Sequence, residues 1–329
     1  RLPCRVKVVV EGEEEIGGPS LSRFLRENRD WLAADAVLIS DSPMLERGLP
    51  SLCYGLRGLT YMEVTVTGAA TDLHSGSFGG AVANPAQALA TILAGLKDGG
   101  NRVAIPGFYD RVRELSRRER DAFAALPFDA EAYRAQLGVP ELAGEEGFST
   151  LERTWARPTL EVNGLLAGFT GEGTKTVLPS RAMAKVSMRL VPDQDWEEIA
   201  RLFREHVLRL APAGVRVDVR THHGGKAFLA ELDHPVMRAA ARALERGFGR
   251  SPVFIREGGS VPVAVDFAEV LGLPVVLMGF GTPDENAHAP NEHLNLENFY
   301  GGMKTVAHFL EEFGGLKGEA AGALPAARL

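Results

Sequence analysis

Apolar and polar positions follow two different periodicities along this chain, and they predict its elements. Residues 5–10 (RVKVVV) and 36–40 (AVLIS) are short apolar runs, typical of strands buried on both faces. Residues 20–32, between them, have the spacing of an amphipathic helix. Strands that alternate with helices in this way predict a mainly parallel sheet that is covered by helices.

The pattern changes near residue 60. Residues 61–67 (YMEVTVT) alternate strictly, as in an antiparallel strand with one face in solvent. This part of the chain therefore looks like an α+β unit rich in strands. In chain order its further predicted elements are helices over 85–96 and 109–124, strands over 159–162 and 182–190, a helix over 196–210 and a strand over 215–221.

The α/β pattern returns after about residue 228, with a helix over 235–248, strands over 253–255 and 275–278, a helix from about 261 and a final helix over 298–313. We therefore predict one α/β domain over residues 1–59 and 228–329, interrupted by an inserted α+β domain of ferredoxin-like type over residues 60–227. The chain begins at Arg1 in the run-up to a predicted core strand, so we expect the N-terminal part of the first domain to be missing.

Composition narrows the possible partners and the compartment. The chain has 36 basic and 43 acidic residues and a net charge of −7, which argues against nucleic acid or an anionic membrane as the main partner. The longest apolar stretch, residues 261–280, contains Asp266 and Glu269 and is too polar to cross a bilayer. Cys4 and Cys53 form no CxxC pattern, which fits a reducing cytoplasm better than a disulfide framework.

The strongest chemical signal is the acidic segment 11–15 (EGEEE), which follows the first predicted strand. Ligands of open α/β sheets bind beyond the carboxyl ends of strands, and clustered carboxylates there indicate a site for a hard metal ion. The alternative is an acidic run that stabilises the N-terminus of the next helix, and this segment alone does not decide between the two.

Two other strand ends carry candidate ligands. Asp41 follows the second strand, although a lone Asp after a strand is usually a turn former. His288 lies in the loop after the strand over 275–278, where a single histidine is more often structural. Oxygen and nitrogen ligands on three strand ends suit zinc, manganese or cobalt better than calcium or magnesium.

Three glycine-rich motifs could contact a substrate. Residues 256–260 (REGGS) precede a predicted helix start, where backbone N–H groups beside Arg256 could bind a carboxylate or an oxyanion; an ordinary βα turn is the alternative. His74 lies in the loop 72–80 (DLHSGSFGG), and His223 lies in 222–226 (HHGGK), where the chain returns to the first domain. Both histidines could also be simple turn residues.

Taken in order, these motifs resemble the M20 family of metallopeptidases, and most closely its carnosinase-like dipeptidases. The matching segments span nearly the whole chain, and they are EGEEEIGG (11–18), LISD (38–41), YGLRG (54–58), DLHSGSFGG (72–80), NP (84–85), KTVLP (175–179), RLVP (189–192), HGGK (223–226), REGGS (256–260) and AHAPNE (287–292).

The resemblance implies a role for each matched residue. Glu14 would be the general base for a water activated by two metal ions, zinc being favoured over manganese or cobalt, and His74 would stabilise the oxyanion from across a dimer interface. The implied metal ligands are Glu15, Asp41 and His288. The implied substrate-binding residues are Thr176, Arg189, His223, Arg256, Gly259 and Ser260. The inserted domain would serve as a lid and would form the homodimer.

The chain departs from the family in one respect: no His-x-Asp ligand motif occurs among its eight histidines. We therefore expect the chain alone to bind metal poorly and to be inactive. The predicted function is hydrolysis of the amide bond of dipeptides or small peptides. The alternatives are an N-acyl-amino-acid amidohydrolase and, for the chain as given, an inactive dimerising fragment.

Overall fold

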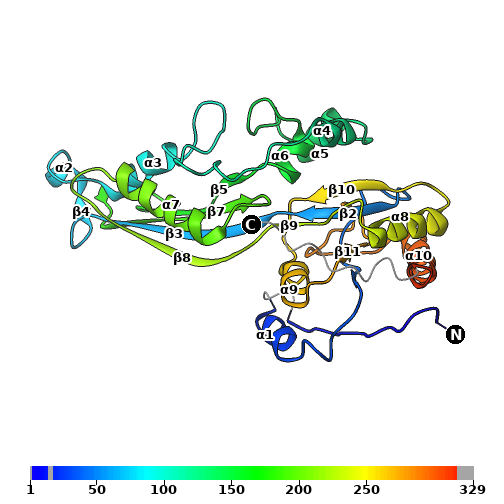
Figure 1. The fold of residues 1–329 in the computed structure, drawn as a ribbon. Helices are drawn as coiled ribbons and strands as arrows, with labels where there is room; N and C mark the ends of the chain where they lie inside the picture. The colour runs from blue at the N-terminus through cyan, green and yellow to red at the C-terminus, as the bar shows by residue number, and fades with distance from the viewer. Residues whose placement is uncertain (1, 14–17, 317–329) are drawn as a thin grey trace. The chain divides into compact units, whose positions relative to one another are not determined.

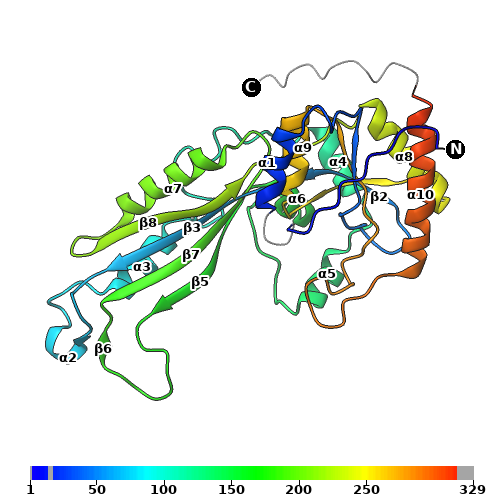
Figure 2. The same ribbon diagram turned by 90° about the horizontal axis from the view of Figure 1, so that it is seen from below.

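A computed structural model describes residues 2–13 and 18–316, and these fall into two compact units (Figures 1 and 2). Unit 1 comprises Arg1–Leu56, Ala122–Leu126 and Phe228–Leu329, and unit 2 comprises Arg57–Asp121 and Pro127–Ala227. From the sequence we expected the two domains to meet at 59/60 and at 227/228, and we did not expect the short segment 122–126 to belong to unit 1.

Unit 1 is built on a mixed sheet. The strands β1 (Val37–Ile39), β11 (Val275–Leu277), β2 (Ser51–Leu56) and β10 (Val253–Glu257) follow one another in that order, and β9 (Phe228–Leu229) also pairs with β2. The pairs β1–β11 and β2–β10 are parallel, whereas β2 is antiparallel to β11 and β9. The predicted α/β class is confirmed, but the sheet is mixed and not mainly parallel, because β2 is antiparallel to both β11 and β9.

Two pairs of helices cover this sheet. They are α1 (Pro19–Glu27) with α9 (Pro262–Leu271), and α8 (Pro235–Phe248) with α10 (Leu296–Gly314). Leu21 and Leu25 of α1 pack against Phe267 of α9, and Gly247 of α8 lets α10 approach so closely that a Cβ there would lie 2.0 Å from Oγ1 of Thr305. The two pairs lie on opposite sides of the sheet (Figures 1 and 2).

The predicted first strand, residues 5–10, is wrong. This segment has no regular secondary structure, and the exposed fractions of Val8 and Val10 are 78% and 90%. Alternating β-branched residues favour an extended backbone, but a strand also requires a neighbour with which to exchange hydrogen bonds. In the described part of the chain, no strand pairs with this segment.

Unit 2 contains a four-stranded antiparallel sheet in the order β5 (Thr159–Ala167), β7 (Arg181–Leu190), β3 (Gly58–Thr67) and β8 (Arg216–Gly225). Alternate residues of β3 are buried, as its sequence predicts. The buried face packs against α3 (Pro85–Ala94) and α7 (Trp196–Leu210), with Leu89 and Phe203 at its centre. The inserted α+β architecture is therefore confirmed.

The remaining elements of unit 2 were less well predicted. They are the short strands β4 (Leu73–His74) and β6 (Val177–Leu178) and the helices α2 (Ser75–Phe78), α4 (Arg117–Ala124), α5 (Ala130–Leu137) and α6 (Thr150–Trp155). Helix α4 belongs to unit 1 from Ala122 onward. The predicted helix over 109–124 is wrong in its first half. The helix begins only after Ser116, whose hydroxyl accepts the N–H of Glu119 while the Glu119 carboxylate accepts the N–H of Ser116, forming a capping box.

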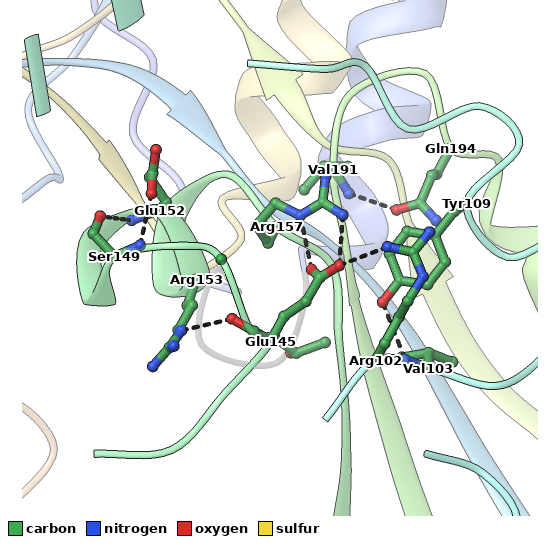
Figure 3. A network of polar contacts seen from close by, with 12 residues as sticks. Arg102, Val103, Tyr109, Glu145, Ser149, Glu152, Arg153, Arg157, Val191 and Gln194 are labelled. Carbon is green, nitrogen blue, oxygen red and sulfur yellow. Dashed lines mark hydrogen bonds and ion pairs between the residues drawn. The ribbon is translucent and has the colours of Figure 1, made fainter. Parts of the chain in front are cut away.

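A buried charge network holds the segment between β3 and β5 in place (Figure 3). The carboxylate of Glu145 accepts hydrogen bonds from Nε and Nη2 of Arg157, both at 2.8 Å, and from Arg102 at 2.9 Å. The Arg102 guanidinium lies 3.7 Å from the centroid of the Tyr109 ring. Because both Glu145 and Arg157 are buried, each charge depends on the other for its stabilisation.

Candidate active site

Asp41 lies where two parallel strands end together. Ile39 of β1 pairs with Leu277 of β11, and the two chains stay side by side beyond the strands, because the Gly279 N–H donates to Oγ of Ser42 at 2.9 Å. Asp41 is exposed within this paired segment. It is therefore held at the carboxyl edge of the sheet, where open α/β sheets bind ligands.

The contact between these strand ends depends on Gly279. A Cβ on this residue would lie 1.6 Å from the backbone oxygen of Ser42, so no other residue fits without moving the backbone. The pairing continues with the Met44 N–H, which donates to the carbonyl of Gly281 at 2.7 Å. The strand end that carries Asp41 is thus fixed against the strand end that leads to the His288 loop.

The loop that carries His288 is tightly turned. His288 has φ 60°, in the left-handed region that non-glycine residues rarely adopt, and so do Asn286 and Asn291. The buried carboxylate of Glu285 closes the loop by accepting the N–H of Asn295 at 3.0 Å. His288 thus lies in a loop downstream of β11 that turns repeatedly through the left-handed region and is closed by Glu285.

Part of the acidic segment supports the start of a helix. The Glu13 carboxylate accepts the N–H of Ser20 in the first turn of α1 at 3.1 Å, and that of Glu11 accepts the N–H of Glu13 at 3.0 Å. For Glu13 the helix-supporting role is therefore the observed one, whereas Glu11 bonds to the backbone before the helix. The predicted base Glu14 and the predicted ligand Glu15 lie outside the described residues.

A pocket of about 420 Å³ lies beside this segment in unit 1. Its walls include Val8, Glu11 and Glu13 together with the rings of Phe24 and Trp31, which meet edge to face with their centroids 6.3 Å apart. The acidic segment therefore adjoins an open apolar pocket.

The donor set of unit 1 fits a divalent metal in chemistry. Asp41 supplies a carboxylate and His288 an imidazole, both following strands of one parallel pair, and this combination suits zinc. Within residues 2–13 and 18–316, no three His, Cys, Asp or Glu side chains come together as a metal site. Asp41 and His288 would therefore need a further ligand from outside the described residues. The predicted ligand Glu15 is such a residue.

Arg256 is buried between two aromatic rings in unit 1. A register shift after Ile255 lets Arg256 pair with Gly55. The aliphatic part of the Arg256 side chain lies close to Gly55, and a Cβ added to this glycine would be only 3.0 Å from it. Its Cζ atom lies 5.0 Å from the centroid of Tyr54 and 6.0 Å from that of Phe123. Cation–π contacts of this kind stabilise a desolvated guanidinium.

The REGGS motif continues from Arg256 into the start of α9. The helix, predicted from about residue 261, begins at Pro262 with Val261 as its N-cap. Gly259 is exposed, and a Cβ there would meet no atom within 4 Å. The structure therefore places Gly259 and Ser260 directly before the helix N-terminus, where N–H groups can bind an anion.

In unit 2, two predicted site residues come into direct contact. His74 of β4 and Thr176 lie beside paired strands, and Nε2 of His74 is 3.2 Å from Oγ1 of Thr176. Nδ1 of His74 accepts the N–H of Gly76 at 3.1 Å. A neutral His74 therefore carries its proton on Nε2, which donates to Thr176.

Arg189 and His223 share the open face of the unit 2 sheet. Arg189 pairs with Leu59, whereas His223 pairs with Tyr61 two residues further along β3. Partial burial lowers the pKa of the Arg189 guanidinium, because burial disfavours its charged form. His223 is exposed and stacks on the ring of Tyr61.

Three aromatic residues next to the candidate site were not singled out from the sequence. Tyr54 and Phe123 flank Arg256, and Tyr61 stacks on His223. Of these three, only Tyr61 could have been recognised from the sequence, because the alternation of residues 61–67 places it on the polar face of its strand. Phe123 lies more than 130 positions from Arg256 in the sequence, and no local pattern joins the two.

Neither cysteine forms a disulfide, as the sequence predicts. Burial raises the pKa of the Cys53 thiol to about 12, so it stays protonated at neutral pH and is a poor metal ligand. No helix among the described residues is long and apolar enough to cross a membrane.

Comparison with known proteins gives consistent matches. The family description "Peptidase family M20/M25/M40" matches residues 1–312. The Cys-Gly metallodipeptidase dug1 of Schizosaccharomyces pombe is 34% identical over 94% of this chain and 66% of its own length. The human Beta-Ala-His dipeptidase is 32% identical over 94% of this chain and 62% of its own length.

A solved structure agrees with these matches. The M20 family metallo-carboxypeptidase Sso-CP2 of Sulfolobus solfataricus superposes with a TM-score of 0.83 at 34% identity, over 92% of this chain and 69% of that one. The chain thus spans somewhat less than two thirds of the length of the two dipeptidases that it matches.

Proposed function

The chain belongs to peptidase family M20/M25/M40, and on that premise we propose that it hydrolyses the amide bond of dipeptides or small peptides with the help of divalent metal ions. The observation that carries the proposal is the arrangement of Asp41 and the His288 loop, which follow the paired parallel strands β1 and β11.

Asp41 and His288 would hold the metal together with Glu15, and zinc suits these ligands best, with manganese or cobalt as substitutes. Bound divalent ions would polarise the scissile carbonyl and make water a better nucleophile. Glu14 would accept the proton of the attacking water and deliver it to the leaving amine.

His74 would stabilise the negative charge that develops on the carbonyl oxygen. In the structure its Nε2–H donates to Oγ1 of Thr176, and the bond of Nδ1 to the Gly76 N–H holds the ring. The oxyanion would accept this Nε2–H in place of the Thr176 hydroxyl. We propose that the protein is a homodimer formed through unit 2 and that His74 serves the active site of the second copy. A cytoplasmic location remains the expectation from cysteine usage.

The substrate would be held by its carboxylate and its peptide carbonyl. Arg256 suits a carboxylate, because a guanidinium can donate two parallel hydrogen bonds to it, and the rings of Tyr54 and Phe123 stabilise its charge. The other proposed substrate-binding groups are the N–H groups near Gly259 and Ser260 in unit 1 and the side chains of Thr176, Arg189 and His223 in unit 2. The names of the relatives, one acting on Cys-Gly and one on Beta-Ala-His, suggest unmodified dipeptides as the first substrates to test.

The decisive experiment is an assay of Cys-Gly and Beta-Ala-His hydrolysis after chelation and after addition of zinc, manganese or cobalt. The absent His-x-Asp motif led us to expect an inactive chain, whereas the proposal predicts turnover that requires metal and that is lost in Asp41→Asn and His288→Gln. Metal-independent turnover, or full activity of both variants, would falsify the proposal. Arg47→Gln, which removes an exposed ion pair with Glu297, is the matched control in unit 1.

Two alternatives have distinct outcomes. An N-acyl-amino-acid amidohydrolase would cleave N-acetylated amino acids faster than dipeptides. An inactive dimerising fragment would show neither activity but would still elute as a dimer in size-exclusion chromatography.

A further inference from the structure

The two adjacent histidines of the HHGGK motif lie in a β-bulge. Along the β3–β8 pair, Tyr61 pairs with His223 but Met62 pairs with Thr221, so His222 is the extra residue. In a regular strand His222 and His223 would point to opposite faces of the sheet. A bulge redirects side chains, and here both imidazoles contact the ring of Tyr61.

The two rings meet Tyr61 in different ways. His223 is stacked on it, with the centroids 5.4 Å apart and the planes at 14°, whereas His222 meets it edge-on at 6.0 Å and 75°. Tyr61 is therefore a contact that both imidazoles share. Aromatic contacts of this geometry stabilise a ring beyond the effect of burial alone.

His222 is held further by charged neighbours. Its Nε2 lies 3.2 Å from Oε2 of Glu63 and 3.2 Å from Nζ of Lys185, and Lys185 forms an ion pair with Glu63. Glu63 follows Tyr61 by two residues on β3 and therefore projects from the same face. These contacts occupy Nε2 of His222.

His223 differs in this respect. Within the described part of the chain, the imidazole of His223 contacts the Tyr61 ring, and the contact is made by the face of the imidazole and not by its edge. Both nitrogens of an imidazole lie at its edge, so stacking fixes the ring plane and leaves the nitrogens available to a ligand. The exposure of His223 agrees with this.

We propose that Tyr61 is the positioning residue for His223: it holds the imidazole plane so that its edge faces the substrate, while His222 meets the same Tyr61 ring edge-on. This inference rests on the proposed function, because it takes His223 as a substrate-binding residue. Tyr61 acts through its ring, and its hydroxyl is not required.

The kinetic test uses the metal-loaded protein and the dipeptide that it cleaves best. Tyr61→Leu should raise KM about three- to tenfold and leave kcat within about twofold, because a stacking contact that orients a binding residue is lost. Tyr61→Phe, which keeps the ring, should restore the wild-type KM. In the background of His223→Ala, Tyr61→Leu should add nothing further.

Additive effects of Tyr61→Leu and His223→Ala, or equal damage by Tyr61→Phe and Tyr61→Leu, would overturn the inference. The matched control is Tyr300→Leu, which removes an exposed tyrosine ring that contacts Phe299 in unit 1. Its KM should equal that of the wild type.

A second measurement does not depend on activity. The ring-proton NMR signals of His223, assigned with His223→Ala, should show a ring-current shift in the wild type and in Tyr61→Phe that disappears in Tyr61→Leu. Equal signals in all three would overturn the positioning role and leave the proposed hydrolysis untouched. If the signals shift as expected but His223→Ala leaves KM unchanged, His223 does not bind substrate, and the inference falls for that reason.

Discussion

Nε2 of His74 lies 3.2 Å from Oγ1 of Thr176, although the two residues are 102 positions apart in the sequence. The short strands β4 and β6 bring them together, since His74 pairs with Val177. The same imidazole accepts the Gly76 N–H through Nδ1, which fixes its tautomer. The DLHSG and KTVLP motifs thus form a single local structure.

This arrangement makes Gly76 sensitive to substitution. A Cβ on Gly76 would lie 2.8 Å from Cε1 of His74, so Gly76→Ala should rotate the ring away from its bond to the Gly76 N–H. We expect kcat for dipeptide hydrolysis to fall about 10- to 100-fold, with an unchanged thermal unfolding midpoint, because a displaced oxyanion donor loses most of its effect.

The control is Gly99→Ala, also in unit 2, where a Cβ would meet no atom within 4 Å. It should leave kcat and the unfolding midpoint as in the wild type. If Gly76→Ala retained full kcat, the ring position of His74 would be irrelevant to the reaction.

Helices with clear periodicity and recognisable ends were predictable. Helix α7 covers the predicted residues because Asp195 accepts the N–H groups of Glu197 and Glu198 at its start. Helix α8 begins at Pro235 and ends before Gly249, which has φ 68°. In both, the sequence alone contains the signals that begin and end the helix.

Strands were harder to predict, because their stability depends on distant partners. Strand β2 (SLCYGL) lacks β-branched residues and was not predicted, yet it is buried along its whole length between β11 and β10. Residues 5–10 have the better strand composition and are exposed. Sheet pairing outweighs local propensity in both segments.

The candidate site was predictable as a set of motifs but not as a set of contacts. Motif order identified His74, Thr176, His223 and Arg256. The support of His223 by Tyr61 depends on a β-bulge, and that of Arg256 by Phe123 depends on tertiary packing. Neither feature has a periodicity that the sequence reveals. The predicted roles of these residues remain predictions.

We expect the buried ion pair of Glu145 and Arg157 to contribute strongly to the stability of the protein (Figure 3). Glu145→Gln would leave the Arg157 charge, only 2% exposed, without its counter-charge. We expect a loss of about 3–5 kcal/mol and a thermal midpoint lower by roughly 6–20 °C, measured by calorimetry. Glu161→Gln, in the exposed pair with Lys97, should cost less than about 1 kcal/mol. Equal midpoints for the two variants would contradict the structure.

The lowered pKa of Glu152 leads us to expect that the free energy of unfolding decreases in acid. Burial raises the pKa of its carboxyl, but hydrogen bonds from Arg120 and Ser149 outweigh burial, and the pKa lies below its ordinary value of about 4.3. Because the folded protein holds this proton less tightly than the unfolded chain, the contribution is complete above pH ~4.3 and is lost as the pH falls through the lowered pKa.

Urea unfolding of the wild type and Glu152→Gln between pH 7 and pH 3 would test this. The wild type should be more stable by a constant amount down to about pH 5, and the difference should shrink at lower pH. A difference that grew on acidification would mean that Glu152 is protonated in the folded protein.

Gly279 allows the position of Asp41 to be tested separately from its chemistry. Gly279→Ala would place a Cβ 1.6 Å from the backbone oxygen of Ser42 and force the ends of β1 and β11 apart, so both the unfolding midpoint and the affinity for zinc should fall. Asp41→Asn removes one candidate ligand charge from an exposed position, so it should weaken zinc binding at an unchanged midpoint. Gly12→Ala, where a Cβ meets no atom within 4 Å, is the control for the midpoint. If calorimetric titration gave equal zinc affinities for Gly279→Ala, Asp41→Asn and the wild type, the edge formed by β1 and β11 would not be where the metal binds.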